Sequence, residues 1–173
     1  KSSKEVESLA QEVESAEGVE FVPALTGLGA PYWVPEARGT LTGLTRGTNK
    51  SHIARATLDA MALQNVDIIT AMEKDLGRKI KSFNADGGAA SNNLLMQLQS
   101  NYFGHKVIRP KIIETTVYGA GLLAGLGVGL WKNIQELKQL WKEDQQFTPT
   151  ISANQRKERL RSWHFAIEKC SKF

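Results

Sequence analysis

The sequence of 173 residues predicts an α/β protein in which helices cover a layered sheet. Strand and helix patterns alternate after residue 39, which is typical of parallel or mixed strand pairing. Turn signals separate the predicted elements, and no internal repeat or low-complexity tract interrupts them. Hydrophobic residues make up 41% of the chain and charged residues 23%, as in an ordinary soluble globular protein.

The first third of the chain is expected to hold one helix and two short strands. A helix over 3–16 follows from an amphipathic pattern and a Ser-x-x-Glu capping-box spacing at its start. A short buried strand is expected over 19–25 and a second strand over 39–45. Between them, three prolines and three glycines over 23–39 predict a long loop without regular structure.

The middle of the chain predicts the main helix and the strands of the principal sheet. The main helix is expected over 51–76, because its apolar residues are too broadly spread for a surface stripe and Gly77 supplies a stop signal. A strand over 80–85, a helix over 92–102 and a strand over 106–109 follow. We expect the main helix to be buried on much of its circumference.

A glycine-rich helix follows Thr115 and Thr116, which we expect to cap it. Gly121, Gly125 and Gly129 recur at steps of four. Because glycine costs up to about 1 kcal/mol per site in a helix, this spacing predicts that the helix packs closely on a sheet or a ligand-bearing loop. A transmembrane dimer face uses the same spacing, but the apolar run over 120–131 is short of the ~20 residues that a spanning helix needs.

The final part of the chain holds Trp131 and Trp141, a break at Pro149 and a last helix over 152–169. Basic residues crowd that helix, interspersed with glutamates, so we expect a solvated face and no nucleic-acid site. These basic residues are Arg156, Lys157, Arg159 and Arg161.

Composition excludes several function classes. The net charge of +4 is spread along the chain and does not indicate a nucleic-acid partner. The single cysteine, Cys170, excludes an intrachain disulfide and favours a reducing, cytoplasmic compartment. It continues the apolar series of the last helix, which predicts a half-buried thiol and no nucleophile. His52, His105 and His164 lie far apart, so no metal site is readable.

The stretch 80–99 carries the strongest functional signal, because a predicted strand runs through Asp86, Gly87 and Gly88 directly into a helix. Glycines let the backbone turn and approach a ligand closely. The helix, with Ser91 and Asn92 as N-cap candidates, points free N–H groups and its positive dipole end at the same place. This arrangement predicts a phosphate cradle, and the carboxylate of Asp86 is a natural partner for Mg²⁺ or its waters.

A plain tight turn is the alternative for these glycines. The spacing matches neither GxxxxGK[ST] nor GxGxxG, so a nucleotide site here belongs to another class.

Three segments, in this order, resemble one family: PALTGLGAPYWVPEARGTLTGLTRGTNKSHIARATLDAMALQ, DGGAASNNLLMQLQSN and TTVYGAGLLAGLGVGLW. They resemble the C-terminal, nucleotide-binding domain of the glycerol kinases, within the FGGY family of carbohydrate kinases. The resemblance implies a ribonuclease-H-like domain of the actin and heat-shock ATPase fold, incomplete at its N-terminal strands. It divides the chain into a helix carried over from upstream, 1–18, and the kinase domain, 19–173.

The resemblance implies transfer of a phosphoryl group from Mg-ATP to glycerol, giving glycerol 3-phosphate. Gly88 resembles the glycine whose N–H faces the phosphates, and Asn92 the asparagine that hydrogen-bonds the adenosine end. Gly87 and Ala89 belong to the same loop, and Asp86 lines the phosphate and metal region. Positioning and charge neutralisation are most of what a kinase site must supply.

The resemblance also implies what this chain lacks. The family's catalytic aspartate, its glycerol-binding Arg-Glu pair and its Gly-Thr-Gly hairpin fall upstream of Lys1, so we expect no catalytic residue here. The start at Lys1, without a methionine, likewise looks like the inside of a longer protein. Glycerol is expected to bind through the other domain, and the family's dimers and tetramers imply a homo-oligomer. Tyr118 and Gly121 depart from the family pattern, which bears on how the glycine-rich helix packs on the loop.

Two other readings stay open. One is a non-catalytic interaction module derived from a kinase, and the other is the same domain of a different FGGY sugar kinase. Tyr32, Trp33 and Arg38 of the long loop either contact a ligand or brace a domain interface.

Overall fold

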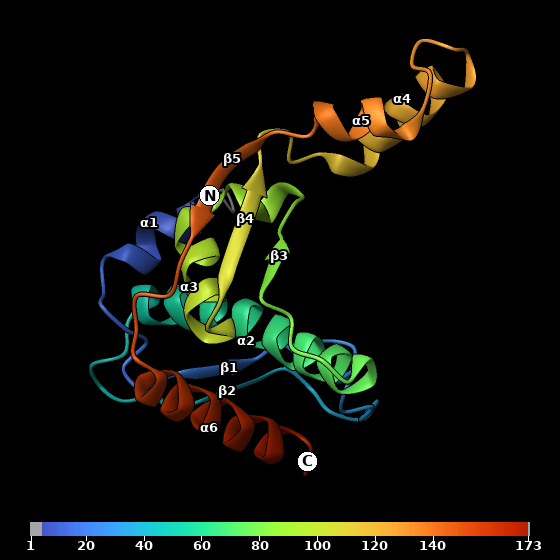
Figure 1. Ribbon diagram of the computed structural model, residues 1–173. Coiled ribbons are helices and arrows are strands. Elements are labelled where there is room, and N and C mark those ends of the chain that lie inside the picture. The colour runs from blue at the N-terminus through green and yellow to red at the C-terminus, as the bar shows by residue number, and fades with distance from the viewer. Residues whose placement is uncertain (1–4, 173) are drawn as a thin grey trace.

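The structure, a computed structural model, describes residues 5–172 (Figure 1). Its helices are α1 Glu5–Gln11, α2 Lys50–Leu76, α3 Asn93–Phe103, α4 Thr115–Gly127, α5 Ile134–Leu140 and α6 Ala153–Cys170, with a 3₁₀ helix, η1, at Gly88–Ser91. Its strands are β1 Glu20–Val22, β2 Thr40–Thr42, β3 Ser82–Asn84, β4 Lys106–Pro110 and β5 Glu143–Phe147. Among the described residues no helix has the length and apolar character needed to cross a membrane.

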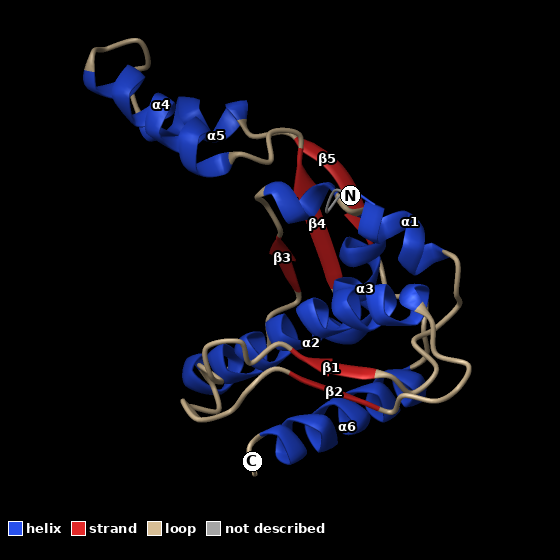
Figure 2. Cartoon of the chain, turned by 180° about the vertical axis from the view of Figure 1, so that it is seen from behind, coloured by secondary structure: helices blue, strands red, loops and turns tan. Residues whose placement is uncertain are grey.

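Helix α2 forms the centre of the molecule (Figures 1 and 2). On one side it packs against α1 and α3, and α3 in turn lies against β4 and β5. On the other side lies the antiparallel pair of β1 and β2, with α6 packed beyond it. The α/β layering expected from the sequence is therefore present.

The principal sheet has the order β3-β4-β5 and is mixed, as predicted. β3 pairs with β4 in parallel, with Phe83 opposite Val107, and the connection between them runs through η1 and α3. β5 pairs with β4 antiparallel, with an irregularity between Arg109 and Pro110. The parallel pairing brings the chain after β3 and the chain after β4 to the same edge of the sheet.

The predicted boundaries of the two longest helices are confirmed. Asn49 caps α2 and forms a capping box with His52, and Gly77 ends the helix with a φ of 64°. Ser152 caps α6 through a capping box with Gln155. Cys170, at the end of α6, is fully buried and not half-buried as predicted, and its thiol donates to the carbonyl of Arg38.

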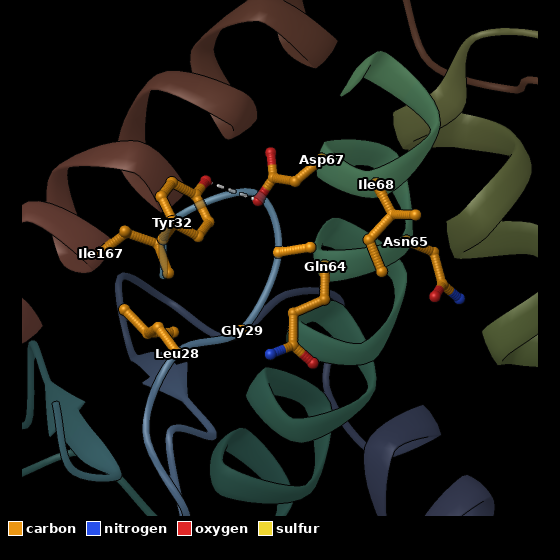
Figure 3. A pocket seen from close by; sticks show the side chains of 9 residues that line it. Leu28, Gly29, Tyr32, Gln64, Asn65, Asp67, Ile68 and Ile167 are labelled. Atoms are coloured by element: carbon orange, nitrogen blue, oxygen red, sulfur yellow. Dashed lines mark hydrogen bonds between the residues drawn. The ribbon is translucent and has the colours of Figure 1, made fainter. Parts of the chain in front are cut away.

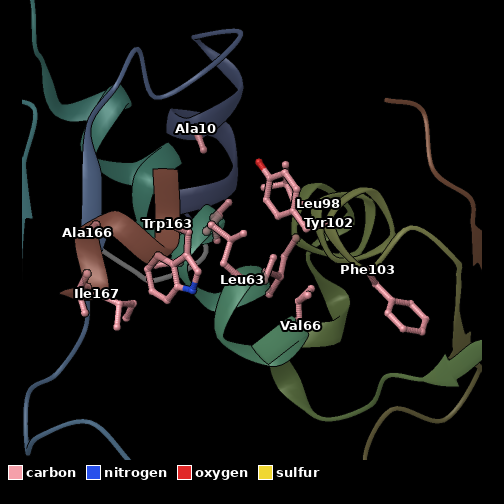
Figure 4. Close-up of a cluster of buried hydrophobic side chains, with 14 of the residues drawn as sticks. Ala10, Leu63, Val66, Leu98, Tyr102, Phe103, Trp163, Ala166 and Ile167 are labelled. Atoms are coloured by element: carbon pink, nitrogen blue, oxygen red, sulfur yellow. The ribbon is translucent and has the colours of Figure 1, made fainter. Parts of the chain in front are cut away.

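The core lies where α2, α3 and α6 meet (Figure 4). Leu63 of α2 and Trp163 of α6 have no exposed surface, and Leu98 and Tyr102 of α3 complete the contact. Burying each such side chain stabilises the fold by about 1.5–3 kcal/mol relative to leaving it in water. This packing anchors the elements that carry the candidate site.

The first helix is shorter than expected, because it ends at Gln11 instead of residue 16. The Ser15 hydroxyl accepts from the backbone N–H of Glu17, a local bond that competes with the helix ladder. Glu17 and Gly18 then adopt positive φ angles of 46° and 83°. The predicted capping box at residues 2–5 begins outside the described residues.

The prediction for the glycine-rich helix is wrong. Gly121 has open space where a side chain would be, and Gly129 lies beyond the end of α4 with a φ of 80°. Only at Gly125 would a side chain collide with another group, the ring of Trp131 in the turn that follows α4. Helices α4 and α5 form an arm that projects from the body instead of packing on the sheet (Figure 2).

Candidate functional site

The loop after β3 has the geometry of a backbone cradle. Gly87 has a φ of 80° and a ψ of 172°, a conformation that is essentially restricted to glycine. A side chain at Gly87 or Gly88 would meet no protein atom within 4 Å, so the space in front of both residues is open. Gly88 and Ala89 open η1, and their N–H groups therefore have no partner within that helix.

Asn92 joins this loop to α3. Its side-chain oxygen accepts from the backbone N–H of Leu95 at 2.8 Å, so Asn92 is the N-cap of α3. The side-chain amide nitrogen remains as a donor at the helix start. Ser91, the other predicted cap, instead donates from its hydroxyl to the carbonyl of Gly88 at 2.7 Å.

A pocket of about 560 Å³ brings three of the predicted residues together, namely Gly88, Ala89 and Asn92. This volume suits a small ligand or cofactor. Its other walls come from α1 and α2, through Val6 and Leu58 among others. The sequence of the loop does not indicate which residues form those other walls.

A neighbouring groove of about 390 Å³ contains Asp86 and shares Ala89 with the first pocket. The Asp86 carboxylate is exposed and accepts a hydrogen bond from the hydroxyl of Thr115. The predicted capping role of Thr115 is therefore wrong. Glu114 occupies the N-cap position of α4 without a side-chain cap hydrogen bond, and the Thr115 hydroxyl donates to Asp86 instead.

The described residues contain no group of three or more His, Cys, Asp or Glu side chains that could hold a metal. Mg²⁺ in kinases needs only one or two carboxylates, because phosphate oxygens and waters complete its shell. The single carboxylate of Asp86, next to the open cradle, fits that requirement.

Asp67 of α2 holds the long loop over 23–39 in place through a hydrogen bond with Tyr32 (Figure 3). Asp67 is buried and accepts from the hydroxyl of Tyr32 at 2.7 Å and from the indole N–H of Trp163 at 2.6 Å. His164 also lies 3.0 Å from its carboxylate. Burial, followed by the bond to the Asp67 carboxylate, raises the pKa of Tyr32. Tyr32 therefore acts as a brace and stays protonated.

The other two loop residues differ. Arg38 donates to the carbonyls of Pro35 and Ala37, so it also holds the loop together. Trp33 has a 74% exposed side chain and a φ of 56°, and its backbone N–H donates to the carbonyl of Gly29 at 2.9 Å.

The predicted fully solvated basic face of α6 is wrong at Arg159, which belongs to a cluster of charged side chains with Glu20 and Asp59. Arg159 donates to Glu20 at 2.5 Å and lies 3.7 Å from Asp59, whose carboxylate accepts from the hydroxyl of Tyr102 at 2.6 Å. Burial raises the pKa of Glu20, and the Arg159 guanidinium partly opposes that effect. Lys157 and Arg161 are exposed, as predicted. Arg159 is drawn inward because the two carboxylates face it from β1 and α2.

Comparison with known proteins places this fold and loop in one family. Residues 1–128 match the FGGY family of carbohydrate kinases, C-terminal domain. The glycerol kinase of Bdellovibrio bacteriovorus is 56% identical over 167 residues, which is 96% of this chain and 34% of that protein. The glycerol kinase of Deinococcus radiodurans is 50% identical over 167 residues, 96% of this chain and 33% of that protein.

Solved structures of related kinases have the same fold as this chain. The glycerol kinase of Plasmodium falciparum, solved with ADP, superposes with a TM-score of 0.88 at 33% identity, over 98% of this chain and 34% of that one. The gluconate kinase of Lactobacillus acidophilus gives a TM-score of 0.80 at 25% identity, over 97% of this chain and 34% of that one. These neighbours confirm the predicted fold class.

The fold is thus that of a carbohydrate-kinase domain with an ATPase-like core. The chain belongs to the FGGY family of carbohydrate kinases and corresponds to its C-terminal domain. It spans about a third of the length of the curated relatives that it matches. The division of the chain at residue 18 stays a prediction.

Proposed function

We propose that this chain is the ATP-binding part of a glycerol kinase, which transfers the γ-phosphate of ATP to glycerol. The observation that carries the proposal is the open backbone cradle at Gly87 and Gly88, which leads into the pocket lined by Gly88, Ala89 and Asn92. Similarity to glycerol kinases at 50–56% identity supports the choice of substrate.

Each residue of the cradle has a task in this proposal. The N–H groups of Gly88 and Ala89 face the phosphates, where fixed donors stabilise negative charge without reorganisation. The amide nitrogen of Asn92 donates to the adenosine end of the nucleotide, while its oxygen keeps capping α3. Asp86 holds Mg²⁺ or its waters, and the ion supplies neutralising charge on the phosphate oxygens.

The rest of the activity depends on residues outside this chain. The other part of the kinase binds the acceptor alcohol and supplies the catalytic base, so this chain alone phosphorylates glycerol at a negligible rate. We also propose that the complete protein is cytoplasmic and assembles as a homo-oligomer. The plasmodial glycerol kinase was solved with ADP, which supports nucleotide binding by this domain.

A chimaera tests the proposal. In it, the matching third of the Bdellovibrio glycerol kinase is replaced by this chain, and binding of Mg-ADP and phosphorylation of glycerol are measured. We expect both to be retained. A folded chimaera that binds no Mg-ADP would contradict the proposal and favour the non-catalytic interaction module.

Two changes at Asn92 sharpen the test. Asn92→Asp keeps the capping oxygen but removes the amide donor, whereas Asn92→Ala removes both. We expect both variants to bind Mg-ADP about tenfold more weakly, and only Asn92→Ala to lose stability, by roughly 1 kcal/mol. If Asn92→Asp binds Mg-ADP as tightly as the parent chimaera, Asn92 is only a helix cap.

A further inference from the structure

Arg109 of β4 has a side chain that is only 11% exposed and reaches the chain segment that follows the cradle. β4 is the central strand of the principal sheet (Figure 1). Its pairing with β5 is irregular between Arg109 and Pro110, and irregularities of this kind redirect the side chains beside them. A guanidinium that is this far buried needs specific partners.

Two of these partners lie on the segment that joins the cradle to α3. Nη1 of Arg109 donates to the carbonyl of Ala90 at 3.0 Å and to the side-chain oxygen of Asn93 at 2.8 Å. Ala90 is buried in η1, directly after the two residues whose N–H groups open that helix. Asn93 is the first residue of α3. The guanidinium therefore binds the chain on both sides of the helix cap Asn92.

Three other contacts hold the guanidinium on β5. Nε donates to the carboxylate of Asp144 at 2.8 Å, and Nη2 donates to the side-chain oxygen of Gln145 at 3.1 Å. The guanidinium also lies over the ring of the buried Phe147, 5.5 Å from the ring centre. Because a guanidinium is planar and presents its donors in a fixed fork, these contacts set its orientation. The segment after the cradle therefore meets a donor whose position is fixed by the sheet.

The bond to Ala90 matters because η1 is a short 3₁₀ helix of four residues. Hydrogen bonds in such a helix have poorer geometry than those in an α-helix. Here they join the N–H of Ala90 to the carbonyl of Gly87 at 3.0 Å and the N–H of Asn92 to the carbonyl of Ala89 at 3.1 Å. The glycines before this turn add conformational freedom. A donor that fixes the Ala90 carbonyl therefore limits the orientations that the N–H groups of the cradle can take.

We propose that Arg109 is a positioning residue for the nucleotide. Its guanidinium transfers the fixed geometry of the sheet to η1 and the start of α3, so that the N–H groups of the cradle and the amide of Asn92 face the nucleotide. Arg109 does not touch the nucleotide and acts through Ala90 and Asn93. This inference rests on the proposed function, because its ligand is the nucleotide assigned to the cradle there.

The charge of Arg109 must be separated from its hydrogen bonds, because a nearby cation favours phosphate binding whatever its geometry. Arg109→Lys keeps the charge but loses the fork, whereas Arg109→Met removes both. If geometry is what matters, lysine cannot replace arginine. Arg156→Met is the matched control, since Arg156 donates to the carbonyl of Phe103 at the other end of α3, at 3.3 Å.

The chimaera with the Bdellovibrio enzyme carries these variants, and its Kd for Mg-ADP and its KM values for ATP and glycerol are measured. Arg109→Lys should raise the Kd for Mg-ADP about fivefold, and Arg109→Met about tenfold or more. The KM for ATP should rise in parallel, and the KM for glycerol should stay within about twofold of the parent. Arg156→Met should leave all three values unchanged.

Hydrogen exchange without nucleotide provides a readout that is independent of catalysis. In folded Arg109→Lys, the N–H groups of Ala90 and Asn92 should exchange at least about fivefold faster, while the centre of α2 keeps its protection. Asn93→Ala is a milder variant at an exposed residue, and it removes only the contact to α3. It should raise the Kd for Mg-ADP about twofold to threefold. If the Arg109 variants do not fold, Asn93→Ala decides, and an unchanged Kd there overturns the proposal.

Three further results would overturn the proposal. They are an Arg109→Lys variant that binds Mg-ADP as tightly as the parent, equal rises in the KM values for ATP and glycerol, and the same loss of affinity in Arg156→Met. Each of them contradicts this inference alone when the parent chimaera binds Mg-ADP. A parent chimaera that binds no Mg-ADP, although Arg109→Lys still speeds exchange over η1, contradicts only the proposed function.

Discussion

The hydroxyl of Thr115 donates a hydrogen bond to the carboxylate of Asp86, which ties the first residue of α4 to the loop that follows β3. A second link is formed by the N–H of Gly87, which donates to the carbonyl of Ile113 at 2.7 Å. Because β3 and β4 are parallel, their carboxyl ends meet at one edge of the sheet, and these bonds join the two chain segments that leave it. The orientation of the Asp86 carboxylate therefore depends on the position of α4.

Thr115→Val tests whether this bond orients Asp86 for a metal-bound nucleotide. In the chimaera we expect the Kd for Mg-ADP to rise about fivefold, the equivalent of one lost hydrogen bond of about 1 kcal/mol, with a smaller change for ADP without Mg²⁺. Isothermal titration with and without the metal measures both values. Thr115→Ser should restore the affinity, and Thr116→Val, at an exposed neighbour, should leave it unchanged. Equal losses with and without Mg²⁺ would argue against a role through the metal.

The two glycines of the cradle should respond differently to the same added methyl group. Gly87→Ala should destabilise the protein by about 1–3 kcal/mol, because a φ of 80° with a ψ of 172° is unfavourable for alanine. Gly88→Ala has open space and no positive φ, so its stability should stay within about 0.5 kcal/mol of the parent. Its affinity for Mg-ADP should nevertheless fall about tenfold, because the methyl group occupies the place where the phosphates approach.

Urea unfolding and nucleotide titration of the chimaera separate these two effects. Gly47→Ala is a matched control, since its methyl group would meet only the Thr45 side chain, at 3.7 Å. Unchanged nucleotide affinity in a stable Gly88→Ala variant would remove Gly88 from the site.

The hydrogen bonds that Tyr32 and Trp163 donate to the buried carboxylate of Asp67 should contribute strongly to the stability of the fold. Tyr32→Phe removes one of its donors and should cost about 1–1.5 kcal/mol. Asp67→Ala leaves the buried indole N–H of Trp163 without an acceptor and should cost about 3 kcal/mol or more. Urea unfolding gives both values, and hydrogen exchange over 28–34 should rise in each variant. Trp33→Ala, at a 74% exposed residue of the same loop, should change stability by less than about 0.5 kcal/mol.

Local signals explain which parts of the fold could be predicted from the sequence. Helix α2 ends where Gly77 stops it, α6 begins at the Ser152 cap, and the cradle turns at Gly87, because each depends on residues close in sequence. β5 was not predicted, since its sequence is polar up to Phe147 and its strand conformation comes from pairing with β4.

The environment of the site depends on contacts distant in sequence. Gly88 and Asn92 could be selected from the loop pattern, but Val6 and Leu58, which wall the same pocket, come from α1 and α2. Asp67 accepts hydrogen bonds from Tyr32 and Trp163, which are separated from it by 35 and 96 positions in the sequence. No local sequence pattern predicts these bonds. The glycine spacing around α4 led to a wrong prediction, because only Gly125 meets a close neighbour, the ring of Trp131, and Gly129 lies beyond the end of the helix.

The last prediction concerns acid stability at the junction of α2 and β3. Glu73 accepts from the ammonium of Lys79 at 2.7 Å and from the N–H of Ile80 at 2.8 Å, and these bonds lower the pKa of Glu73 below its ordinary value of 4.5. A carboxyl group with a lowered pKa stabilises the fold above its unfolded-state pKa, and this stabilisation disappears as the pH falls through the folded-state value. Glu73→Gln should therefore cost roughly 0.5–1 kcal/mol at pH 7, and the difference from the parent should shrink as the pH falls below about 4.5. Urea unfolding between pH 3.5 and 7 measures this difference in the free energy of unfolding. Lys79→Gln is the matched variant, because it removes the cation but keeps the bond between Glu73 and Ile80. Its difference from the parent should depend less on pH. A difference that grows on acidification would mean that Glu73 does not stabilise the fold through its charge.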